Sequence, residues 1–266
     1  MSLSTNCQAC LLLTVRLSEK DQSDLLTPQQ WGEICDKFGG VQNLEQILES
    51  SPKVVLEQHG VEDELKVKVL ALLGRGVGLA MASEKWLRSG VWILSAGDRE
   101  YPRNLHLLPV KSMPPVLFGY GSVEMLEHSS VAIDQRLSSV GAAELAAAVD
   151  DLAACTVGML DESHSRGVTL VSIASGGQAI GVTYKDLLEY GSAAELRRGI
   201  LDGALTIIST RPPGQYDPRP PIYERAVVAG LADDELTQHI VRKFANQKPE
   251  APDQQEPPAQ QLDLNF

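Results

Sequence analysis

The densest group of chemically capable side chains follows a short apolar segment, TVGML, at residues 156–160. Asp161, Glu162 and His164 carry oxygen and nitrogen atoms of the kind that act as metal ligands. Ser165 next to His164 pairs a hydroxyl with a base. Neighbouring side chains point apart, however, and no Gly-x-Ser-x-Gly turn surrounds this serine. We therefore interpret the group as a polar loop after a strand, and we predict no catalytic residue and no enzyme activity.

Two further patterns suggest chemistry that their surroundings do not support. Cys7 and Cys10 form a Cys-x-x-Cys pair, but a zinc site needs four ligands and no second close pair exists. The GRGVG segment at residues 74–78 resembles a phosphate loop, yet no strand precedes it. We predict an ordinary buried or frayed N-terminal cysteine pair and close helix packing at the glycines, with no metal and no cofactor.

Composition limits the setting and the partners. The chain has 266 residues, a net charge of −12 and a pI of about 4.9, which argues against a surface coated with basic residues for tight nucleic-acid binding. Its four cysteines do not suggest a disulfide framework, so we expect a reduced, cytoplasmic setting. No run of eighteen apolar residues predicts a transmembrane helix, and we expect no membrane contact.

Helical patterns fill the first third of the chain. Thr27 and Pro28 look like a helix start, with Gln30 at the capping-box position. A longer apolar-periodic segment runs over residues 62–86 and is interrupted by glycines. We predict a helical N-terminal domain over residues 1–90, similar to a sterile-alpha or helix-hairpin-helix bundle.

Strand-like and helical segments alternate after the helical region. We expect short strands at residues 91–95, 116–118, 130–133, 156–160, 178–184 and 204–209, with helices at 141–154, 166–175, 185–201 and 226–242. This spacing predicts an α/β domain over residues 91–245, with a Rossmann-like, doubly wound, mostly parallel sheet. Ligands of such sheets bind at the carboxyl ends of the strands.

The segment Gly97–Gly119, GDREYPRNLHLLPVKSMPPVLFG, carries a family resemblance. Together with the helical N-terminal region and the following α/β pattern, it resembles the DNA-processing protein A (DprA/Smf) family. That resemblance implies a Rossmann-like domain that binds single-stranded DNA and helps to load a recombinase onto it, without catalytic turnover. It also implies anion-binding loops after the first and second strands and at the helix ending in Ala-Gly-Leu.

Those loops depart from the family pattern in this chain. The first reads Asp134-Gln135-Arg136, the third contains Glu224 and Arg225, and the second, Gly158–Ser165, has lost its glycines and its arginine. Glycine lets backbone amides approach an anion closely, whereas Met159 and Leu160 are expected to obstruct that approach. The acidic side chains should repel phosphate as well. We therefore predict a divergent member with degenerate anion-binding loops.

Four arginines remain as candidate DNA contacts: Arg136, Arg211, Arg219 and Arg225. Our leading hypothesis is a non-enzymatic protein of DNA processing, recombination or phage and mobile-element defence, which binds single-stranded DNA weakly and acts through protein partners as a homo-oligomer. One alternative is a nucleotide-binding or nucleotide-sensing protein with a rebuilt pocket around Asp134, Glu162 and Arg225. Another is a structural subunit of a DNA-defence complex.

The last residues change character. Residues 246–266 are rich in Pro, Gln and Glu, which is typical of a disordered tail. The tail ends in Gln-Leu-Asp-Leu-Asn-Phe, which resembles the bacterial sliding-clamp-binding motif. Apolar side chains could fill a cleft while an amide bonds beside it, and the candidate partner-binding residues are Gln261, Leu262, Leu264 and Phe266. A sliding clamp or a recombinase is the expected partner.

Overall fold

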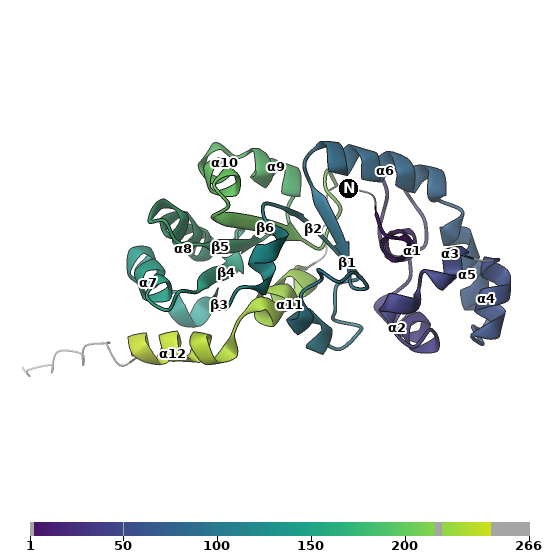
Figure 1. The fold of residues 1–266 in the computed structure, drawn as a ribbon, viewed down its shortest axis with the longest axis horizontal. Coiled ribbons are helices and arrows are strands. Elements are labelled where there is room, and N and C mark those ends of the chain that lie inside the picture. The colour runs from purple at the N-terminus through teal and green to yellow at the C-terminus, as the bar shows by residue number, and fades with distance from the viewer. Residues whose placement is uncertain (1–2, 50, 216–219, 246–266) are drawn as a thin grey trace, which may run out of the picture.

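The fold is given by a computed structural model that describes residues 3–49, 51–215 and 220–245. Helices make up the first part of the chain, and a sheet flanked by helices makes up the rest (Figure 1). The N-terminal helices are α1 (Thr5–Thr14), α2 (Pro28–Lys37), α3 (Gln46–Glu49), α4 (Pro52–Gln58), α5 (Asp63–Leu73) and α6 (Gly76–Arg88). Within the described ranges, no helix is long and apolar enough to cross a bilayer.

Local sequence signals set the ends of the N-terminal helices. The predicted capping box at the start of α2 is confirmed, because Thr27 and Gln30 bond to each other's backbone amides at 3.2 and 3.1 Å. The prediction that the glycines of GRGVG pack helices closely is wrong. They mark the junction of α5 and α6, where Arg75 turns inward and donates to the Val15 carbonyl at 3.2 Å and to Asp21 at 2.7 Å.

The sheet is mixed but mostly parallel, as predicted. Its strands lie in the order β1-β2-β6-β5-β4-β3, with β3 to β6 parallel and with β2 antiparallel to both of its neighbours. In register, Val157 lies opposite Ile180, and Ile180 lies opposite Thr206. The strands are β1 (Trp92–Ser95), β2 (Val116–Tyr120), β3 (Ser130–Ile133), β4 (Cys155–Met159), β5 (Ala179–Val182) and β6 (Leu205–Ser209).

Helices cover both faces of the sheet, which confirms the α/β fold class. The connections from β3 to β6 step in one direction, so their helices lie side by side, and α11 returns across β3, β4 and β5 (Figure 1). The predicted single helices at residues 185–201 and 226–242 are each broken in two. The helices are α7 (Ala142–Asp150), α8 (Ser163–Ala174), α9 (Leu187–Ser192), α10 (Ala194–Leu201), α11 (Ile222–Leu231) and α12 (Asp234–Ala245).

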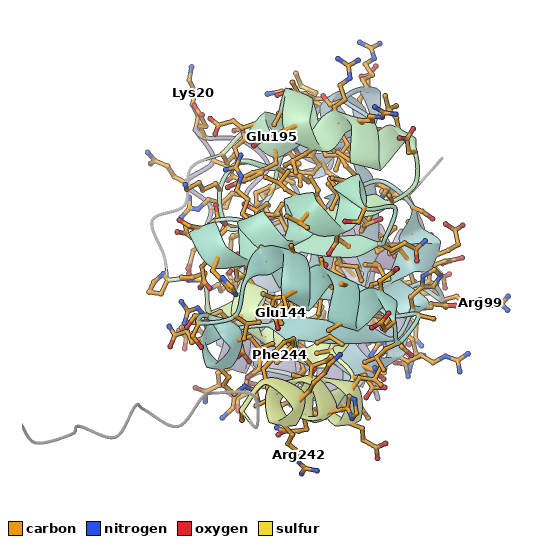
Figure 2. All side chains as sticks on the ribbon, turned by 90° about the vertical axis from the view of Figure 1, so that its left-hand side faces the viewer. Lys20, Arg99, Glu144, Glu195, Arg242 and Phe244 are labelled. Carbon is orange, nitrogen blue, oxygen red and sulfur yellow. The ribbon has the colours of Figure 1, made fainter. Side chains whose placement is uncertain are left out.

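The outer edge of β3 is closed by α12 and the link before it. Thr237 on α12 accepts a hydrogen bond from the Ala132 amide at 3.1 Å, and the Asp233 amide donates to the Ser130 carbonyl at 2.7 Å. Phe244 packs into the core cluster that includes residues of β3 and α7, while Arg242 points outward (Figure 2). These contacts satisfy backbone groups that an open sheet edge leaves unpaired.

The helical unit and the sheet share one hydrophobic core. Trp86 on α6 meets Phe118 on β2 edge-on at 5.2 Å, and its indole nitrogen donates to the Pro213 carbonyl at 3.2 Å. Helix α1 is almost wholly buried between the other N-terminal helices and strands β1 and β2. The boundary near residue 90 therefore lies within continuous packing, and the division into two domains there stays a prediction.

The segment Gly97–Gly119 joins three parts of this fold. Asp98 accepts hydrogen bonds from the Ser95 amide at 2.6 Å and from the Ser4 hydroxyl, which also caps α1. The Tyr101 hydroxyl donates to the Pro114 carbonyl at 2.7 Å. Leu105 is fully buried against Gly230, where an added Cβ would lie 2.5 Å from the leucine side chain. The conspicuous residues of the segment thus hold α1, β1 and α11 together.

Gly97 tests this role directly. A Cβ at Gly97 would lie 1.5 Å from the Asn6 side-chain nitrogen and 3.2 Å from the Val41 carbonyl oxygen. We expect Gly97→Ala to lower the free energy of unfolding by about 1–3 kcal/mol, because the buried Asn6 side chain must move and the Val41 carbonyl is crowded. The measurement is urea unfolding followed by circular dichroism.

Gly141→Ala is the matched control for Gly97→Ala. Gly141 has a φ of −63° and no atom within 4 Å of an added Cβ, so this change should stay within about 0.5 kcal/mol of the unmodified protein. Equal stability of the two variants would contradict the close approach of Gly97 to α1.

Candidate functional site at the carboxyl edge of the sheet

The parallel strands β3 to β6 end at one edge of the sheet, and three of the predicted DNA contacts, Arg136, Arg211 and Arg225, lie near it. A cavity of about 400 Å³ lies at this edge between the ends of β3 and β4 and helices α11 and α12. The cavity brings together the three residues of the predicted nucleotide pocket, Asp134, Glu162 and Arg225, and adds Arg136. Its other lining residues are Ala132, Ile133, Gln135, Met159, Val228, Ala229, Ala232, Asp234 and Thr237.

Arg136 is bound by the acid two residues before it. The Asp134 carboxylate accepts from the Arg136 backbone amide at 2.8 Å and from the guanidinium Nε and Nη2 at 2.9 and 2.6 Å. These hydrogen bonds raise the pKa of Arg136, and the fork-to-carboxylate geometry is the one that a phosphate would need. Arg136, which we predicted as a DNA contact, is therefore already paired with the carboxylate of Asp134.

Arg225 faces an acid from a different element. Its Nη2 lies 3.2 Å from Glu162 Oε1, and both side chains remain partly exposed. Glu162 is the residue immediately before α8, at the end of the helix whose dipole favours negative charge. A carboxylate of this chain thus stands where the family pattern places an anion-binding loop.

Arg211 is held inside the protein. Its Nε donates to Glu224 Oε1 at 2.7 Å, and the two side chains are only 7% and 2% exposed. The Thr210 hydroxyl bonds to the same carboxylate oxygen at 2.8 Å, and the Tyr184 ring lies 5.6 Å from the guanidinium carbon. Arg211 ties the end of β6 to the first turn of α11, so its predicted role as a DNA contact has no support in this geometry.

Asp161 links the ends of β4 and β5. Its fully buried side chain accepts from the Thr183 hydroxyl at 3.0 Å, the Tyr184 amide at 2.9 Å and the Tyr190 hydroxyl at 2.8 Å. Burial, followed by the hydrogen bond to Asp161, raises the pKa of Tyr190. The carboxylate is committed to these partners, and within the described ranges no three metal-binding side chains converge.

Two expectations about the loop after β4 are corrected or refined. Leu160 does not obstruct the edge, because it is buried in the core over Gly181, where a Cβ would lie 2.6 Å from it. Met159 does line the cavity. Within the described part of the chain, neither His164 Nε2 nor Ser165 Oγ has a hydrogen-bond partner, so these neighbours do not form a nucleophile pair.

The remaining candidates lie elsewhere. Arg219 and the tail residues Gln261, Leu262, Leu264 and Phe266 fall outside the described residues. Cys7 and Cys10 are buried free thiols, and burial raises the pKa of Cys7 to about 12. Sequence reasoning missed the hydrogen bond that Arg211 donates to Glu224, and the only local signal was an acid placed thirteen residues after the arginine.

Comparisons with known proteins give a limited result. No protein-family model matches this chain, and no curated protein matches it. Among solved structures, the chain is similar to DNA processing protein A (DprA) from Streptococcus pneumoniae, with 17% sequence identity and a TM-score of 0.48. The match covers 92% of this chain and 85% of that chain. At this level the likeness transfers neither chemistry nor partners to the present chain.

Proposed function

We propose that this protein is a non-catalytic scaffold of DNA processing whose sheet edge is neutralised by its own acids. The observation that carries the proposal is the pairing of Arg136 with Asp134 and of Arg225 with Glu162 around one cavity. The DNA-processing context rests on the resemblance of the segment Gly97–Gly119. The scaffold role rests on these two ion pairs, because arginines that are bound to acids of the same chain are not available to a ligand.

Paired arginines leave little attraction for phosphate. Affinity for single strands depends on how many phosphates meet a cation and release their counterions. The two exposed cations of this cavity already have carboxylate partners, and the whole chain carries a charge of −12. Weak, salt-sensitive binding of single-stranded DNA follows, and the protein acts mainly through protein partners and as a homo-oligomer.

The C-terminal residues Gln261 to Phe266 are our proposed contact to a sliding clamp or a recombinase. Their apolar side chains alternate with polar ones at the very end of the chain. Such a segment can dock into an apolar cleft of a partner protein.

The test is a titration of the purified protein against a fluorescent oligo-dT at low and at moderate salt. We expect a dissociation constant weaker than about 10⁻⁴ M at moderate salt, the weak end of non-specific nucleic-acid binding, and a measurable shift only at low salt. Tight binding at moderate salt would overturn the proposal. Absence of binding at low salt would remove DNA contact from it.

A mononucleotide is the second candidate ligand, because the cavity has the size of a small-molecule site and contains both acids and cations. The phosphate would have to displace Asp134 or Glu162 from its arginine. Thermal shift with millimolar ATP or GTP is the discriminating measurement. A clear rise of the melting temperature would favour this reading over the scaffold, and an unchanged melting temperature would favour the scaffold.

A further inference from the structure

A second cavity lies beside the edge strand β1, away from the candidate site. It has a volume of about 580 Å³ and is formed by the start of α1, the end of α6, strand β1 and the segment after β2. Part of its surface is apolar, contributed by Leu3, Leu87, Trp92, Ile93, Leu94 and Val123. Partly buried apolar walls of this kind bind an apolar group of a ligand.

The rest of the lining is acidic. Asp98, Glu100, Glu124 and Glu127 contribute carboxylates, and none of the described residues that line the cavity is Lys, Arg or His. Arg99, the nearest cation in sequence, extends into solvent at the edge of the molecule (Figure 2). The acids therefore face the cavity without a cation in its lining.

The negative charge extends to the wall of the cavity. Burial, followed by the nearby Asp98 charge, raises the pKa of the Cys7 thiol to about 12. Asp98 is fixed by the amide and hydroxyl of Ser95 at 2.6 and 2.8 Å, while Glu100 and Glu127 are exposed. The cavity thus combines one positioned carboxylate with acids that can turn toward a ligand.

The cavity is also separate from the arginine-bearing edge. Gly121 and Ser122, which line it, lie at the amino end of β6, where the Thr206 hydroxyl donates to the Ser122 carbonyl at 2.7 Å. The candidate site lies at the carboxyl ends of the parallel strands. A ligand of one cavity therefore leaves the other accessible.

We propose that the β1 cavity binds a short segment of a partner protein in which an apolar side chain is flanked by Lys or Arg. The apolar wall suits the apolar side chain, and the four acids complement the flanking cations. Nucleic acid does not suit this cavity, because its phosphates would meet four carboxylates and no cation among the lining residues. This inference names a partner site on the proposed scaffold, but it does not depend on the sheet edge or on DNA.

The test uses a fluorescein-labelled peptide, Lys-Leu-Lys-Leu-Lys, titrated by anisotropy against the full chain. Glu100→Gln combined with Glu127→Gln should weaken binding about tenfold, because two exposed ion pairs are lost. Glu144→Gln combined with Glu189→Gln removes the same charge from exposed positions on α7 and α9, outside the cavity, and should change the affinity less than about twofold. Glu-Leu-Glu-Leu-Glu should not bind.

The position of the bound peptide is determined by NMR, from the indole N–H resonances of the three tryptophans. Trp92 lines the cavity and donates to the Gly121 carbonyl at 3.0 Å, so its resonance should shift while that of Trp86 stays in place. Equal weakening by both double variants, equal binding of the acidic peptide or an unmoved Trp92 resonance would overturn the inference. Oligo-dT binding by the Glu100/Glu127 variant should be unchanged, which separates this result from failure of the scaffold proposal.

Discussion

Asp134→Asn combined with Glu162→Gln should raise the affinity for single-stranded DNA about tenfold at low salt. Both acids hold exposed arginines, Arg136 and Arg225, on the wall of one cavity. Releasing an exposed ion pair costs up to about 1 kcal/mol, so the loss of two such pairs corresponds to about one decade in affinity. The measurement is oligo-dT anisotropy over a series of salt concentrations.

The salt dependence of that variant carries a second expectation. Each phosphate that an arginine neutralises releases its counterions. The slope of log affinity against log salt should therefore steepen by roughly one unit or more for the two arginines together. The control is Glu144→Gln with Asp151→Asn, which removes the same charge at exposed positions on and just after α7. If the control binds as well as the Asp134/Glu162 variant, net charge and not the released arginines governs binding.

Arg211→Met should destabilise the protein by about 3–5 kcal/mol at neutral pH. The change leaves the Glu224 carboxylate buried, with a side chain that is 2% exposed. Of its two described hydrogen-bond partners, Arg211 and Thr210, only the Thr210 hydroxyl then remains. Arg225→Met, which breaks the exposed pair with Glu162, is the matched control and should cost less than about 1 kcal/mol. Urea unfolding at several pH values measures both.

A second substitution, Glu224→Leu, should recover most of the stability lost in Arg211→Met, because no buried charge then remains. An additive loss in the double variant would show that Glu224 contributes independently of Arg211.

Several features follow from local sequence alone. The capping box of Thr27 and Gln30 and the alternation of short apolar strands with helices both involve residues close in sequence. Their geometry is set by the backbone over a few residues, so pattern and spacing predict them. The parallel sheet agrees with the same alternation, because parallel strands need a crossover connection, which is usually a helix.

The helix breaks were not predictable in the same way. The sequence predicts one continuous helix at residues 185–201 and another at residues 226–242. Each of these helices is broken in the structure, and its second half follows the sheet. At the second break, the Asp233 amide bonds to the Ser130 carbonyl and directs α12 along the open edge of β3. That position depends on which strand ends the sheet, and the strand order is a tertiary property.

By itself, the sequence determined the α/β class and the absence of glycine from residues 159–165, at and after the end of β4. Only the tertiary structure decided which acid meets which arginine. Glu162 and Arg225 are 63 residues apart and meet because α8 and α11 both begin at the carboxyl edge. Such pairing depends on strand order and helix placement to within a few ångströms, because ion pairs form only at short range.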